Sequence, residues 1–119
     1  MTNKNSDFFL SVFDVVRLIP EGRVTSYGAI AKYLGSPRSS RVVGYAMNAS
    51  HQYENIPAHR VVNRVGMLTG RAHFSPPELM EERLTAENII VKNHQIQNFD
   101  KIFWDPSIEL SDDLDVDYN

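Results

Sequence analysis

Two short helical patterns separated by a tight polar turn constrain the fold of this chain more than any other feature. Ser26 can cap a helix over residues 27–34, and Gly35 is placed to end it. Residues 36–40 form a short polar turn, and a second helical pattern follows over residues 41–49 and opens on a basic side chain. This arrangement predicts a helix-turn-helix, with the second helix in the recognition position.

The flanking segments predict a small domain around this motif. An apolar face with helical spacing predicts a preceding core helix, and its members are Phe8, Phe9, Val12, Val15, Val16 and Ile19. Residues 61–69 have the pattern of two strands around a glycine-containing turn, in the position of a wing. We therefore expect a mainly α fold with a small β wing, a winged helix-turn-helix.

The C-terminal half predicts fewer elements. Residues 75–87 should form a helix with prolines in its first turn, and residues 89–91 a short strand. Residues 99–104 fit a last strand or an extended segment. A chain of 119 residues has room for one core. We expect residues 1–105 to form that domain and residues 106–119 to be an acidic, disordered tail.

The charges are unevenly distributed along the chain. The formal net charge is −3, but residues 17–71 hold eight basic and two acidic residues. From Asp105 onward there are six acids and no base. The basic stretch could neutralise several phosphates, and the acidic tail would repel them or occupy the basic face in the absence of DNA.

The composition also excludes several kinds of chemistry. The sequence contains no cysteine, so disulfides, thiolate metal sites and a cysteine nucleophile are ruled out. The four histidines match no familiar zinc spacing, and no glycine-rich phosphate loop occurs, so we expect neither a metal nor a cofactor. No apolar run approaches the roughly 20 residues of a membrane span. We expect a cytoplasmic protein without a membrane partner.

Four pieces of sequence, in a fixed order, resemble the C-terminal DNA-binding domain of the O6-alkylguanine-DNA alkyltransferases. They are GRVTSY at 22–27, GSP at 35–37 with SRVVGYAM at 40–47, IPAHRVV at 56–62, and Gly66 in the expected hairpin. In that family a cysteine occupies the position of Ala58 and accepts the alkyl group. Alanine has no lone pair to attack with, so the chain is similar to the non-enzymatic alkyltransferase-like subfamily.

The resemblance implies roles for residues around the recognition helix. Arg41 corresponds to the arginine that fills the gap left by a base rotated out of the duplex, and Gly44 lets the helix lie close to DNA. Tyr27 corresponds to a tyrosine that crowds the backbone and bonds the flipped base. Arg71 corresponds either to an arginine that senses the alkylated guanine or to a wing contact with phosphate.

Further implied roles lie around Ala58. His59 and Glu87 correspond to the pair that activates the family's cysteine; here they would remain as a hydrogen-bonded network, with Arg60 bracing the loop and belonging to the lesion-binding set. Three positions are expected to present backbone to the base edge: Ala58, Val61 and Ala72. Ser50 replaces the family's hinge asparagine, and the alanine at position 58 should enlarge the pocket.

The resemblance implies a monomeric sensor of DNA damage. Such a protein would bind double-stranded DNA containing O6-alkylguanine, flip the base without transferring the alkyl group, and present the lesion to nucleotide excision repair proteins, associated with the nucleoid when bound. One alternative is a winged-helix transcription regulator, for which the small residues Gly44, Ala46 and Ala49 are poorly suited. A second is an enzyme with a repurposed pocket that uses His59 as a general base.

Overall fold

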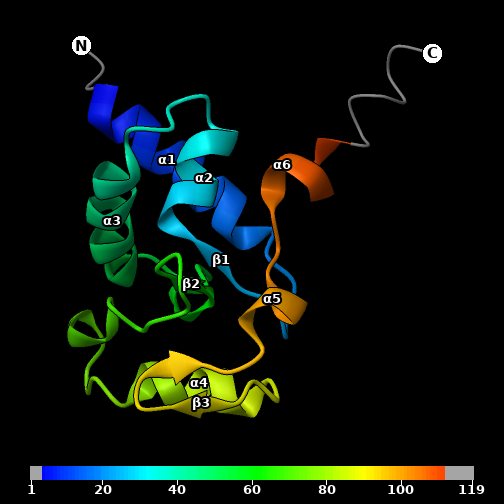
Figure 1. Cartoon of the computed structure of the whole chain (residues 1–119). Coiled ribbons are helices and arrows are strands. Elements are labelled where there is room, and N and C mark those ends of the chain that lie inside the picture. Colours follow the sequence, from blue (N-terminus) through cyan, green and yellow to red (C-terminus); the bar gives the residue numbers. More distant parts are fainter. Residues whose placement is uncertain (1–3, 112–119) are drawn as a thin grey trace.

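The computed structural model describes residues 4–111. The β1–β2 pair (Thr25–Ser26 with Val61–Val62) lies at the centre, next to α2, whereas the β3–β4 hairpin (Val91–Lys92 with Gln95–Ile96) lies beside α4 at the edge of the molecule, away from α1 and α6 (Figure 1). The α-helices are α1 (Lys4–Arg17), α2 (Tyr27–Tyr33), α3 (Ser40–Ala49), α4 (Leu79–Ala86), α5 (Phe99–Ile102) and α6 (Pro106–Glu109). The 3₁₀ turns are η1 (Ser50–Gln52), η2 (Ala58–Arg60) and η3 (Arg71–His73). Within these residues, no helix combines the length and apolar character needed to cross a membrane.

The helix-turn-helix forms as the sequence predicts. The Ser26 hydroxyl accepts a hydrogen bond from the Ala29 amide at 3.1 Å and caps α2. Gly35 has a φ of +80°, and the Ser36 amide donates to the Ala31 carbonyl at 2.9 Å, which closes the end of the helix. Helix α3 then starts at Ser40 after the polar turn.

The wing differs from the predicted hairpin. Strand β2 (Val61–Val62) pairs in parallel with β1 (Thr25–Ser26), so it does not pair with the residues that follow it. The Asn63 side chain accepts hydrogen bonds from the amides of Val65 and Met67, and this tight turn redirects the chain. Residues 66–68 are bonded to residues 94–96 instead. The expected two-stranded wing is therefore a loop attached to the C-terminal hairpin.

The C-terminal hairpin is formed by β3 (Val91–Lys92) and β4 (Gln95–Ile96). The strand predicted at 89–91 therefore begins two residues later, at Val91, and ends one residue later. The prediction of a strand or extended segment over 99–104 is wrong for its first part, where α5 forms. Asn98 turns the chain with a φ of 56°, and the helix begins directly after it. The Trp104 amide donates to the Val24 carbonyl at 2.7 Å, so only the end of the segment is extended.

Two further boundaries differ from the predicted ones. Helix α4 begins at Leu79, so the two prolines form a turn before the helix and lie outside its first turn. Helix α6 is capped by Asp105, whose side chain accepts from the Ser107 amide at 3.0 Å, and it packs against α2. The first part of the predicted disordered tail is therefore helical, and residues 112–119 lie outside the described residues.

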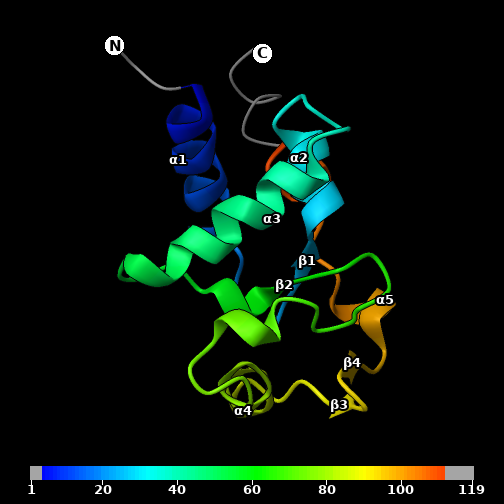
Figure 2. The same ribbon diagram turned by 90° about the vertical axis from the view of Figure 1, so that its left-hand side faces the viewer.

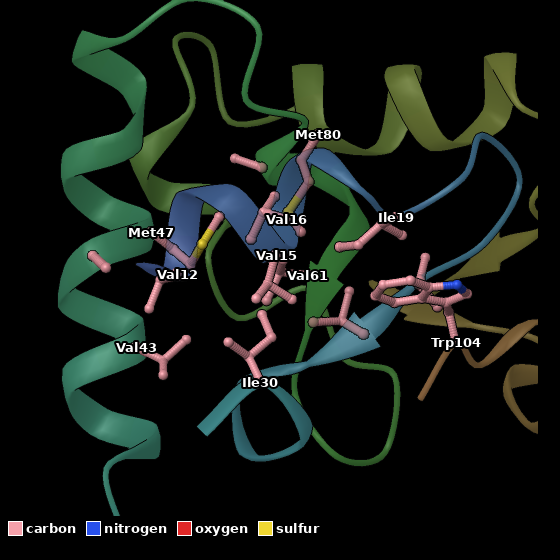
Figure 3. Packing of buried hydrophobic residues seen from close by; sticks show 14 of the residues in the cluster. Val12, Val15, Val16, Ile19, Ile30, Val43, Met47, Val61, Met80 and Trp104 are labelled. Atoms are coloured by element: carbon pink, nitrogen blue, oxygen red, sulfur yellow. The ribbon is translucent and has the colours of Figure 1, made fainter. Parts of the chain in front are cut away.

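One hydrophobic core joins these elements (Figure 3). Helix α1 contributes Val12 and Val16, both fully buried, and α3 contributes Val43 and Met47 on the facing side. Met80 of α4 is fully buried in the same cluster, next to the helix that carries it (Figure 3). Burial of this cluster fixes α3 against the molecule along its inner face and leaves its outer face open to solvent.

Candidate nucleic-acid interface

A groove of about 760 Å³ runs along the outer face of α3. Figure 2 shows α3 crossing the molecule above the β1–β2 pair, with the loop from β2 to η3 below it. The groove is lined by Tyr27, Ser40, Arg41, Gly44, Tyr45, Asn48, Asn63, Thr69, Gly70 and His73. Arg41 is exposed on the first turn of α3, and no acidic side chain lines the groove. Its chemistry therefore suits a polyanion.

A much smaller cavity of about 10 Å³ lies next to this groove. It is lined by Tyr27, Met47, Asn48, His51, Ala58, Val61, Gly70, Phe74 and Met80. Tyr27, Asn48 and Gly70 line both spaces, so the cavity adjoins the groove at these residues. A volume of this size holds about one water. The enlarged pocket that the sequence led us to expect at Ala58 is therefore closed in this conformation.

Gly70 sets the position of Tyr27 at this junction. A Cβ atom on Gly70 would lie 3.0 Å from the Tyr27 hydroxyl oxygen. A Cβ contact this short is tighter than nearly all those in real structures, so a larger residue would push the tyrosine hydroxyl aside by a few tenths of an ångström. The Thr69 hydroxyl also reaches the Tyr27 hydroxyl, at 3.5 Å.

The structure brings some of the predicted site residues together and separates others. Tyr27, Arg41 and Gly44 line the groove, whereas the buried Ala58 and Val61 line the cavity beside it. Three predicted residues line neither space: Arg60, Arg71 and Ala72. The last two belong to η3, directly after Gly70 at the junction.

Glu87 is the centre of a buried hydrogen-bonded network behind the η2 turn. Its carboxylate lies 2.6 Å from Nε2 of His59 and 2.8 Å from Nη2 of Arg60, and it accepts from the Gly22 amide at 2.9 Å. Arg60 also donates through Nη1 to the Ile19 carbonyl at 2.9 Å. These bonds connect the turn to the end of α1 and to α4, so Arg60 braces the loop.

The network fixes the charge states of its members. The hydrogen bonds from Arg60, Gly22 and His59 outweigh the cost of burial and lower the pKa of Glu87 from 4.5 to about 2. Burial lowers the pKa of His59, against the attraction of Glu87. A carboxylate only accepts, so Nε2 of the neutral imidazole carries the proton. Nδ1 is then an acceptor, and it is buried without a hydrogen-bond partner among the described residues.

Several lining residues are missing from the site predicted from the sequence, and they come from the loop after β2. Asn63, Thr69 and Gly70 approach α3 only because that loop folds back. The asparagine was a usable signal, because asparagine side chains commonly shape such turns. Phe74 and Met80 reach the cavity from outside the motif, and no local pattern marks them as site residues. Among the residues that the structure describes, no three His, Asp or Glu side chains converge as metal ligands would.

The helix-turn-helix, the groove along α3 and the His59–Glu87 network define a DNA-binding domain of the alkyltransferase type. The sequence model for the DNA-binding domain of 6-O-methylguanine DNA methyltransferase matches residues 7–89. The chain therefore belongs to the family of that domain. Because its sequence has no cysteine, transfer of an alkyl group to a cysteine thiolate is excluded for this member.

The chain is similar to relatives that are named for DNA recognition. Alkyltransferase-like protein 1 of Schizosaccharomyces pombe is 33% identical over 84% of this chain and 96% of its own length. The DNA base-flipping protein of Escherichia coli is 40% identical over 74% of this chain and 67% of its own. The crystal structure of S. pombe Atl1 with damaged DNA containing O6-carboxymethylguanine matches 89% of this chain and 100% of that one, with 33% identity and a TM-score of 0.75.

Proposed function

We propose that this protein is a non-enzymatic sensor that binds double-stranded DNA, rotates an O6-alkylated guanine out of the helix and holds it without removing the alkyl group. One observation supports this most: Tyr27, Asn48 and Gly70 line both the groove along α3 and the cavity beside Ala58. A base leaving a duplex seated in the groove would therefore enter that cavity directly. The S. pombe relative was crystallised with an O6-alkylated guanine, which fits the same lesion class.

The groove supplies the contacts that such a complex needs. Arg41 is exposed on the first turn of α3, so it can occupy the gap that the rotated base leaves in the stack. Gly44 is only half-buried and has no atom within 4 Å of where a Cβ would stand, so α3 leaves open space there for the DNA backbone. Tyr27 stands at the mouth of the cavity and is placed to bond the incoming base.

Entry of a base requires the cavity to open. Its volume of about 10 Å³ is far below that of a ligand site, so residues that close it must move aside before a base can enter. The wall of the cavity contains His51 and Phe74, whose rings pack edge-to-face with their centroids 4.5 Å apart. Displacement of this pair would bring η3, with Arg71 and Ala72, into the binding site. Arg71 is then positioned either to sense the guanine or to contact phosphate.

Alanine at position 58 makes the function one of binding and signalling. Ala58 and Val61 both line the cavity, and the hydrogen bond between His59 and Glu87 holds the turn in place. A bound lesion would persist and mark the position for other proteins. We propose nucleotide excision repair proteins as those partners, a monomer as the binding unit, and a cytoplasmic, nucleoid-associated location. Residues 1–105 would carry the binding, and the acidic segment after them would modulate it.

The test is a fluorescence titration of matched duplexes with and without one O6-methylguanine at fixed salt. We expect the lesion duplex to bind at least about tenfold more tightly, a difference of about 1.4 kcal/mol. The modified strand should keep its mass after incubation with excess protein, because nothing accepts the alkyl group. Equal affinities for the two duplexes would contradict the proposal, and a sequence motif selected from random DNA would favour a transcription regulator.

A further inference from the structure

A second large cavity, of about 440 Å³, lies behind the η2 turn. Its lining includes Ile56 and Pro57 before the turn and His59 and Arg60 within it. It shares no lining residue with the groove along α3 or with the cavity beside Ala58. Consecutive residues of one turn, Ala58 and His59, thus line different spaces, and the DNA groove does not account for this second one.

The charged side chains that line the cavity are all basic. Three guanidinium groups line it, those of Arg17, Arg60 and Arg83, and no carboxylate does. Arg60 is fully engaged by Glu87 and the Ile19 carbonyl. The other two are available to a ligand because their present interactions are weak.

Arg17 and Arg83 differ in how they are held. Nη1 of Arg17 lies 3.3 Å from Asp14, one turn earlier on α1, and both side chains are exposed, so the pair contributes little to stability. Arg83 has no ion pair among the described residues, and its guanidinium lies 5.9 Å from the centre of the Phe74 ring. Arg83 is also close enough to His59 that its charge helps to lower the pKa of that imidazole.

We propose that this cavity binds an acidic segment of a protein partner, with carboxylates on Arg17 and Arg83 and an apolar side chain against Ile56 and Pro57. A volume of 440 Å³ accommodates a few side chains, which is more than a single inorganic anion needs. A DNA backbone would require cations spaced along a track, whereas these converge on one space.

The position of the site has a functional consequence. The partner would touch η2, the turn that carries Ala58, through His59 and Arg60, which do not line the lesion cavity. Binding of the acidic segment needs no DNA and goes beyond lesion recognition. It can therefore fail or succeed independently of the proposed sensor function.

The test uses the full chain and a fluorescein-labelled decapeptide that alternates glutamate with leucine, followed by fluorescence anisotropy at fixed ionic strength. We expect saturable binding that weakens about tenfold in the double variant Arg17→Gln/Arg83→Gln, in which two exposed charge contacts are lost. The matched control is Lys92→Gln/Lys101→Gln, which removes two exposed charges away from the cavity. This control should bind the peptide within about twofold of the parent chain.

A second measurement locates the peptide. Histidine resonances in NMR spectra should shift for His59, which lines the cavity, and remain in place for the exposed His94. Equal loss of affinity in both double variants, or binding of a glutamine-for-glutamate peptide as tight as the acidic one, would overturn the proposal. So would displacement by equimolar inorganic phosphate or undamaged duplex. A large gain in affinity on deleting residues 112–119 would assign the site to the chain's own tail and also overturn it.

Discussion

Glu87→Gln should destabilise the protein by about 3 kcal/mol, because Glu87 is the common acceptor of a buried network. The Glu87 side chain is 9% exposed and that of Arg60 is 16% exposed. The substitution therefore leaves the guanidinium of Arg60 without its counterion at a nearly buried position. Removing one partner of a buried ion pair typically costs about 3–5 kcal/mol. The fall of the Glu87 pKa from 4.5 to about 2, which the same contacts cause, corresponds to about 3 kcal/mol of preference for the ionised form in the folded state.

The same interaction predicts how stability depends on pH. The folded-state pKa of Glu87 lies below its ordinary value, so the stabilisation is complete above pH 4.5 and is lost as the pH falls toward about 2. His59 acts in the same direction, because its lowered pKa lets the unfolded chain take up the proton first below pH 6.5. Glu87→Gln should abolish the Glu87 contribution to the pH dependence of stability between pH 4.5 and 2. The contribution of His59 should remain.

The assay is urea unfolding at several pH values, followed by the fluorescence of Trp104, which is the only tryptophan of the sequence and is buried. The slope of the unfolding free energy against urea concentration should be unchanged, while the urea concentration at the midpoint of unfolding should fall. Glu82→Gln, an exposed position on the same helix, is the matched control and should change stability by less than about 0.5 kcal/mol. A loss below about 1 kcal/mol in Glu87→Gln, with unaltered pH dependence, would refute the role of the network.

Three further predictions concern the DNA-binding site. Arg41→Ala should weaken binding of a lesion duplex by about tenfold or more, whereas Arg38→Ala in the preceding turn should cost far less; equal losses in titrations would reduce Arg41 to a phosphate contact. Gly70→Ala should lower the affinity for a lesion duplex severalfold with little change in melting temperature, because the new Cβ meets only the far end of the Tyr27 side chain. An unchanged affinity would show that lesion binding does not need the tyrosine hydroxyl at this position. Ala58→Cys should accept an alkyl group slowly, which intact-protein mass spectrometry would detect, and a complete lack of transfer would mean that the network no longer supports activation.

The elements that the sequence predicted well are those fixed by local chemistry. Ser26 caps α2 through its own side chain, and Gly35 ends that helix because its φ of +80° suits glycine. The wing was predicted as a hairpin because its strands are adjacent in sequence. Val61 and Val62 instead pair with residues 25–26, more than thirty positions away, and a local pattern carries no information about such a partner.

The site shows the same division. The resemblance in sequence named Tyr27 and Arg41, the small residues of the second helix pointed to Gly44, and all three line one groove in the structure. Gly70 was not found, since its importance depends on the approach of a tyrosine from an element far away in the sequence. Arg60 was assigned to the lesion-binding set; the structure pairs it with Glu87, and it lines neither the groove along α3 nor the cavity beside Ala58.

The survival of the His59–Glu87 pair without a nucleophile has a structural explanation. Glu87 accepts from Arg60 and the Gly22 amide as well as from His59, so losing it would leave a nearly buried cation and a backbone donor without an acceptor. The network is therefore maintained by its contribution to folding even though Ala58 needs no activation. His59 differs from Arg60 and Glu87, because its buried Nδ1 accepts no hydrogen bond from the described residues. His59→Phe should thus cost the fold much less than Glu87→Gln, which separates the inherited part of the site from the part that stability requires.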